Sequence, residues 1–98
     1  MLVRVVKMTF RAEAVEAFKT FFDETKDEIR GFEGCTHLEL WQDTINTNIF
    51  FTYSHWHNEN ALAHYRSSTF FKNTWSKTRQ LFAEKAEAWS VNQIIMLK

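Results

Sequence analysis

The fold of this chain is decided by the stretch Ile49-Phe50-Phe51-Thr52-Tyr53-Ser54-His55-Trp56. Its β-branched and aromatic residues predict a strand over residues 49–56. Because successive side chains of a strand point to opposite faces, Phe50 and Trp56 fall on one face, and Phe51 and Tyr53 on the other. The strand is apolar on both faces, which predicts a sheet that is covered on both sides.

Two further strands and a helix are expected before this stretch. Alternating apolar residues predict a strand over residues 2–10, with Val6 on one face and Val5 on the other. Apolar residues three and four positions apart predict a helix over residues 14–30. It lacks a good N-cap, and we expect it to end at Gly31 in a left-handed conformation. A strand over residues 35–42 and a polar hairpin loop over residues 43–48 then lead to the quoted stretch.

Two helical segments and a last strand are expected after it. Asn58 can cap a short helix over residues 59–66, and Ser67-Ser68 interrupts this helix and offers a new cap. A longer helix over residues 69–85 and a strand over residues 88–96 follow. The order β-α-β-β-α-β predicts a ferredoxin-like α+β fold, with a four-stranded antiparallel sheet and helices on one face. We expect one domain over residues 1–98.

The second apolar face of this sheet needs a cover that the chain's own helices do not supply. A large uncovered apolar face predicts a protein partner. The simplest partner is a second copy that packs sheet to sheet about a two-fold axis. We therefore expect a homodimer, in the arrangement called a dimeric α+β barrel.

Composition excludes several classes of protein. The 98 residues contain 12 Lys and Arg and 12 Asp and Glu, with the signs interspersed, so we expect no nucleic acid or membrane partner. Cys35 is the only cysteine, so it can form neither an internal disulfide nor a Cys-based zinc site, and we expect a buried thiol. Without a long apolar run or a signal peptide, the expected location is cytoplasmic.

Four short motifs resemble one known family. Members of the antibiotic biosynthesis monooxygenase (ABM) family commonly show an aromatic third strand that ends in Trp, an Ala-Leu-x-x-His helix and a Ser-x-x-Phe helix start. The corresponding residues are Phe51-Thr52-Tyr53-Ser54-His55-Trp56, Ala61-Leu62-Ala63-His64 and Ser67-Ser68-Thr69-Phe70-Phe71, and Gly31-Phe32-Glu33-Gly34-Cys35 looks like the family's turn into the second strand. The resemblance covers nearly the whole chain and implies a dimeric α+β barrel with a substrate pocket between sheet and helices.

The resemblance also implies an activity. Family enzymes oxygenate phenolic polycycles and use neither flavin nor metal, so we expect no cofactor. The deprotonated phenol can itself pass an electron to oxygen, if the protein supplies an aromatic slot, a proton acceptor and hydrogen bonds to the developing charge. The expected function is a cofactor-independent monooxygenase acting on a quinol or polyphenol. The alternative is a homodimer that binds a small aromatic ligand without turning it over, or that is purely structural.

The haem-degrading branch of the family is a poor match. Its functional Asn, Trp and iron-ligating His align with Val6, His64 and either Thr74 or Trp75, so all three positions depart from the pattern. Haem degradation is therefore not expected.

His64 is the candidate catalytic residue, because it matches the family's helix histidine. An unperturbed imidazole has a pKa of about 6.5, so His64 would accept a proton or orient the substrate; the alternative is a structural histidine. The other pocket candidates are Tyr53, Trp56, Tyr65, Trp75, His37 and His55, whose rings could instead pack in the core or at a dimer interface. Arg66 and Asn73 could bind a substrate oxygen or lie on a solvated helix face.

Two further site hypotheses involve His37. His55 and His57 share a strand face, and His37 would join them as a third metal ligand if it lies opposite His55, a register that the loop does not fix. No metal-binding motif supports this set, so we expect no metal. Cys35 would be a nucleophile only if His37 activated it.

Overall fold

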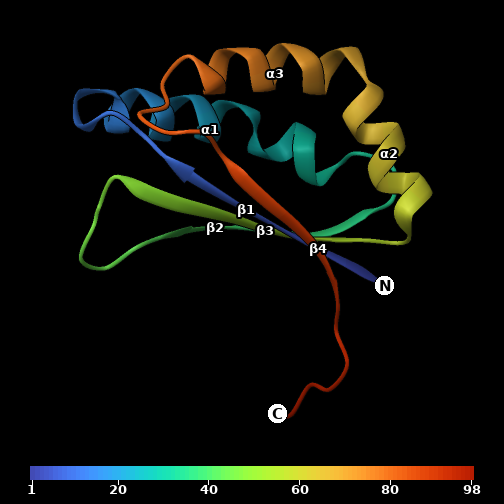
Figure 1. Cartoon of the computed structure of the whole chain (residues 1–98). Helices are drawn as coiled ribbons and strands as arrows, with labels where there is room; N and C mark the ends of the chain where they lie inside the picture. Colours follow the sequence, from blue (N-terminus) through green and yellow to red (C-terminus); the bar gives the residue numbers. More distant parts are fainter.

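The computed structural model describes residues 1–98. The elements are β1 (Leu2–Thr9), a 3-10 turn η1 (Ala12–Ala14), α1 (Val15–Arg30), β2 (Cys35–Gln42), β3 (Ile49–Trp56), α2 (Glu59–Ser67), α3 (Thr69–Arg79) and β4 (Glu87–Asn92). The four strands pair antiparallel in the order β2-β3-β1-β4, and the helices lie on one face of the sheet (Figure 1). The predicted ferredoxin-like α+β fold is confirmed.

Side-chain caps divide the second helical region into α2 and α3, as predicted. The side chain of Asn58 accepts a hydrogen bond from the Ala61 N–H at 2.9 Å, and the Ser68 hydroxyl accepts one from the Phe71 N–H at 3.1 Å. Helix α1 has no side-chain cap and is entered through η1 instead. The break between α2 and α3 therefore has a local cause in the sequence.

The glycine with a left-handed backbone is Gly34 rather than the predicted Gly31. The prediction of a left-handed Gly31 is wrong, because its φ of −81° is helical and its N–H donates to the Asp27 carbonyl at 2.9 Å. The positive φ, +90°, belongs to Gly34. A Cβ there would also lie 2.5 Å from the Ala61 Cβ, so Gly34 permits both the turn into β2 and the close approach of α2.

The helix predicted over residues 69–85 ends early, at Arg79. After it, the chain turns back to the end of β1, where Phe82 forms an isolated bridge with Phe10. The two rings pack with centroids 5.3 Å apart, and the Ala83 N–H donates to the Thr9 carbonyl. Tertiary packing of Phe82 therefore overrides the helical periodicity. The first strand also ends one residue earlier than predicted, at Thr9.

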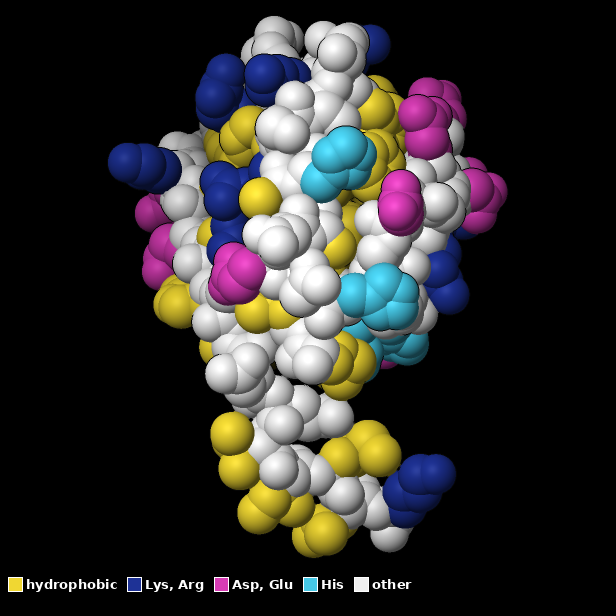
Figure 2. Space-filling view, turned by 90° about the vertical axis from the view of Figure 1, so that its right-hand side faces the viewer, with side chains coloured by type: hydrophobic (Ala, Val, Ile, Leu, Met, Phe, Trp, Pro, Cys, Tyr) yellow, Lys and Arg dark blue, Asp and Glu magenta, His cyan; other side chains and the backbone are white.

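The last strand is shorter than its sequence predicted. β4 ends at Asn92 rather than at residue 96, because Asn92 pairs with Leu2, the first residue of β1. Beyond this pair no neighbouring strand remains to accept hydrogen bonds. The following tail leaves the body of the molecule (Figure 1; Figure 2), with Ile94, Ile95, Met96 and Leu97 exposed.

The core lies on the helix-covered face of the sheet, in two clusters. One contains Met8, Phe10, Phe18 and Phe50, and the other contains Leu2, Ile29, Cys35, Trp56, Leu62 and Tyr65. Phe10 is fully buried and stacks on Phe18 with ring centroids 4.0 Å apart. The prediction that Cys35 is buried is confirmed.

The opposite face of the sheet is rich in aromatic and apolar residues, with Lys7 and Glu39 among them, and has no helix over it (Figure 1). Trp41 stacks on Tyr53 at 4.7 Å between ring centroids, yet 41% of Trp41 and 44% of Trp89 remain exposed. We call this surface, which also carries Val5, Phe51 and His55, the bare face. None of the helices combines the length and the hydrophobicity that a membrane-spanning segment requires.

Candidate functional site

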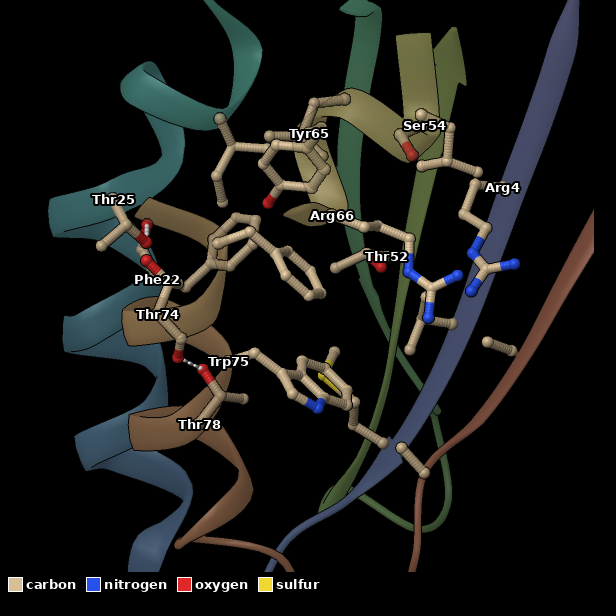
Figure 3. Close-up of a pocket in the computed structure, with 18 of the residues that line it drawn as sticks. Arg4, Phe22, Thr25, Thr52, Ser54, Tyr65, Arg66, Thr74, Trp75 and Thr78 are labelled. Atoms are coloured by element: carbon tan, nitrogen blue, oxygen red, sulfur yellow. Dashed lines mark hydrogen bonds between the residues drawn. The ribbon is translucent and has the colours of Figure 1, made fainter. Parts of the chain in front are cut away.

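A cavity of about 280 Å³ lies between the sheet and the helices, with its polar and aromatic lining shown in Figure 3. Its sheet wall comes mainly from β1 and β3, with Leu38 of β2 and Ala88 of β4, and its helix wall comes from α1, α2 and α3. The lining includes Arg4, Val6, Met8, Thr52, Ser54 and Trp56 from the sheet, and Phe22, Tyr65, Arg66, Phe71, Thr74 and Trp75 from the helices. Since an apolar cavity of about 150 Å³ accepts benzene, this one has room for about two fused rings.

Aromatic rings form much of the wall. Trp56 stacks on Tyr65 with centroids 4.8 Å apart, and its Nε1 donates to the Ser54 hydroxyl at 3.0 Å. Phe71 and Trp75 lie nearly parallel, with centroids 6.0 Å apart. Trp56 is only 1% exposed, so it packs behind the cavity wall, whereas Trp75 is half-buried. Flat rings on both walls favour a flat aromatic ligand.

Two aromatic side chains in the cavity carry hydrogen-bond donors that have no acceptor in the protein. Neither the Tyr65 hydroxyl nor the Trp75 Nε1 takes part in a side-chain hydrogen bond, whereas Thr78 donates to the Thr74 carbonyl at 2.9 Å (Figure 3). Burial raises the pKa of the Tyr65 phenol, so Tyr65 stays protonated at neutral pH. Tyr65 and Trp75 can therefore donate to an oxygen atom of a ligand.

Two arginines lie on the β1 side of the cavity. The guanidinium groups of Arg4, on β1, and Arg66, on α2, are directed to the same region (Figure 3). Burial and the nearby Arg66 charge lower the pKa of Arg4, while Glu59 acts in the opposite direction. The Arg4 Nη1 donates to the Ser90 hydroxyl of β4 at 2.9 Å, which fixes its side chain.

The residues proposed from sequence fall into two groups. Trp56, Tyr65 and Trp75 line the cavity. Tyr53 and His55 lie on the bare face, because strand alternation separates them from Trp56. His37 lies on the bare face too, opposite His55.

His64 does not line the cavity. Its side chain is exposed on α2, and its ring contacts Phe32 with centroids 5.8 Å apart. The role of His64 as proton acceptor stays a prediction that this position does not favour. Of the two polar candidates, Arg66 lines the cavity and Asn73 does not.

The histidines of the hairpin take the register that a metal site would need, but they do not form one. His37 pairs with His55, and their ring centroids are 4.8 Å apart. His57 lies beyond the end of β3, and no three His, Cys, Asp or Glu side chains are placed to hold a metal ion. The nearest partner of the His37 Nε2 is the Glu39 carboxylate.

The hypothesis that His37 activates Cys35 is wrong. A bulge between these residues places Cys35 in the core opposite Trp56, while His37 faces the other way. Burial also raises the pKa of the Cys35 thiol, which disfavours the reactive thiolate.

Sequence reasoning did not propose Arg4, Thr52 and Ser54 as cavity residues. Each stands at a position where the strand alternation predicts an inward side chain: Arg4 between Leu2 and Val6, and Thr52 and Ser54 between Phe50 and Trp56. A polar residue at a core position is unusual unless it has a partner or a function. These polar residues at inward-facing strand positions could therefore have been recognised from the sequence.

Comparison with solved structures supports the fold. An antibiotic biosynthesis monooxygenase superposes with a TM-score of 0.90 at 15% identity, over 97% of this chain and 100% of that one. A conserved protein from Methanosarcina mazei Go1 gives 0.87 at 22% identity, over 95% and 93%. A variant of SnoaB, a cofactor-independent oxygenase from Streptomyces nogalater, gives 0.87 at 17% identity, over 98% and 95%.

Sequence comparison identifies the family. No curated protein matches the chain. The sequence profile described as "Antibiotic biosynthesis monooxygenase" matches residues 1–76, which is most of the chain and includes β1 to β3, α1, α2 and most of α3. The chain therefore belongs to the antibiotic biosynthesis monooxygenase family.

Proposed function

We propose that this chain is a cofactor-independent monooxygenase that acts on an electron-rich phenolic substrate of the quinol or polyphenol type. The observation that carries the proposal is the aromatic cavity with two unpaired donors, Tyr65 and Trp75. Membership of the family and the likeness in fold to SnoaB support the same reaction class.

The chemistry needs no electron source beyond the substrate. In an anthrone, a CH₂ group becomes C=O while the second atom of dioxygen leaves as water, and the substrate supplies all the electrons. The reaction begins when the phenol or enol loses its proton. Hydrogen bonds from Tyr65 and Trp75 to the resulting oxyanion would stabilise it and lower the substrate's pKa. No Asp, Glu or His side chain lines the cavity, so water is the proposed proton acceptor.

An oxygen-uptake assay tests the proposal. The purified chain, with chelator present and no flavin added, is mixed with an anthrone or a reduced naphthoquinone. We expect oxygen uptake well above the buffer rate and a product that gains one oxygen atom by mass spectrometry. Uptake at the buffer rate across a broad panel of phenols would contradict the proposal. His64→Ala tests the proton acceptor separately, and we expect it to keep its activity.

A ligand-binding role without turnover is the second candidate, and the lack of a base in the cavity lining favours it. It predicts that an aromatic ligand stabilises the fold by about 2.7 kcal/mol at a hundredfold excess over its Kd, with no product formed. Thermal melts and product analysis of the same samples distinguish the two functions.

We also propose that the chain acts as a homodimer, with the bare faces of two copies in contact. The exposed Trp41 and Trp89 support this arrangement, as does the apolar tail over residues 94–97. An isolated chain would leave these groups in water, and burying them is the main source of free energy for association.

A further inference from the structure

Arg4 and Arg66 are the part of the cavity lining that the proposed oxygenation does not use. They come from β1 and α2, which are far apart in the sequence, and their guanidinium groups share one side of the cavity (Figure 3). The charge of Arg66 is close enough to lower the pKa of Arg4. The fold therefore holds two like charges near each other beside an apolar space, with Arg4 half-buried and Arg66 exposed to solvent.

No carboxylate of the chain neutralises this pair. The ion pairs in the structure are Arg11–Glu13, Lys19–Glu16, Lys26–Asp23 and His37–Glu39. Glu59 only offsets part of the effect on Arg4. The single hydrogen bond that fixes the Arg4 side chain goes to the neutral Ser90 hydroxyl. An anion from outside the chain would therefore find two cations without a carboxylate partner, of which Arg4 is already held in place by Ser90.

We propose that Arg4 and Arg66 bind a carboxylate on the aromatic ligand of this cavity, so that the substrate is an aromatic acid. This inference rests on the proposed function and narrows its substrate class. A planar guanidinium donates two parallel hydrogen bonds that match the two oxygens of a carboxylate. The rings of Tyr65 and Trp75 line the same cavity and would hold the aromatic body, while the arginines would set its orientation.

Equilibrium binding of two ligands with the same rings tests the inference. 1-Naphthoate carries the carboxylate, 1-naphthamide is its neutral counterpart, and both are titrated by calorimetry. We expect 1-naphthoate to bind about 10- to 100-fold more tightly, the range for hydrogen bonds to a charged group. We also expect this preference to shrink as salt is added. Equal affinities, or no binding of either ligand, would overturn the inference.

Charge-removing variants assign the effect to the two arginines. Arg4→Gln and Arg66→Gln should each weaken 1-naphthoate binding about 10-fold and leave 1-naphthamide binding unchanged. Arg79→Gln removes the same charge from an exposed position outside the cavity and should change neither affinity. An equal loss in Arg79→Gln would show a general charge effect and refute the site. Thermal melts of each variant show that it is folded.

Two further outcomes separate related hypotheses. Tighter binding of 1-naphthyl phosphate than of 1-naphthoate would overturn the choice of a carboxylate. Both probes lack an oxidisable phenol, so their binding does not depend on turnover. A clear preference for 1-naphthoate without oxygen uptake on any phenol would refute the monooxygenase and keep the arginine site. Oxygen uptake on a phenol, together with equal affinities for 1-naphthoate and 1-naphthamide, would keep the monooxygenase and refute the arginine site.

Discussion

The two faces of the sheet carry similar aromatic residues but have different surroundings. On the helix side of β3, Phe50 and Trp56 are 2% and 1% exposed, and the polar residues Thr52 and Ser54 lie between them beside the cavity. On the bare face, Phe51 and Tyr53 pair with the charged residues Lys7 and Glu39 of the neighbouring strands, and no helix covers them. Polar residues beside a cavity on the covered face therefore favour a ligand site, whereas exposed aromatic residues on a face without a cover favour a protein interface.

The largest effect is expected in the covered core. Phe10→Ala removes a fully buried ring that packs against Phe18, Phe50 and Phe82. We expect a loss of about 3–5 kcal/mol in the free energy of unfolding, or about 12 °C or more in Tm. Ile45→Ala, at a position 86% exposed, is the control and should leave the Tm unchanged. A small loss in Phe10→Ala would mean that the core readily collapses around the cavity.

The second-largest effect is expected for substitutions on the bare face. Trp89→Asp places a charge on the proposed dimer interface, while Trp89→Phe keeps an apolar ring there. We expect the aspartate variant to raise the dimer Kd about 100-fold and to sediment as a folded monomer at micromolar concentration. The phenylalanine variant should remain a dimer. A wild-type chain that is itself monomeric under these conditions would remove the proposed interface.

A smaller effect is expected inside the cavity. Tyr65→Phe keeps the ring that stacks on Trp56 and removes only the unpaired hydroxyl. If the hydroxyl stabilises a developing oxyanion, kcat should fall about 100-fold, with little change in Tm. Steady-state oxygen uptake measures kcat, and a thermal melt measures the stability. An unchanged kcat would place the oxyanion elsewhere, for example at Trp75.

The smallest effect is a dependence of stability on pH at the bare face. Burial and the His37 charge lower the pKa of His55 from 6.5, while Glu39 acts in the opposite direction. The folded state therefore binds fewer protons at His55 than the unfolded chain does, so stability falls as the pH drops through about 6.5, until the folded imidazole also titrates. We expect the Tm to decrease between pH 7.5 and pH 5.5, and to decrease less in His55→Phe. Equal slopes for the two proteins would contradict this account.

Most of the elements could be predicted from the sequence because their causes are local. Caps at Asn58 and Ser68 start α2 and α3, and strand alternation separates Phe50 from Phe51. The errors in the sequence-based prediction occur where contacts between residues far apart in the sequence determine the local structure. Phe82 leaves its helical pattern to pack on Phe10, and β4 ends where β1 offers no further partner. The bulge after Cys35 likewise turns His37 away from the core.

By itself, the sequence determined the order of elements, the two apolar faces of the sheet and the family of the chain. Only the tertiary structure decided which aromatic residues share a cavity, and that Arg4 and Arg66 meet beside it while His64 stays outside. The physical reason is that hydrophobic periodicity depends on near neighbours along the chain, whereas a site depends on how strands and helices pack across the sheet.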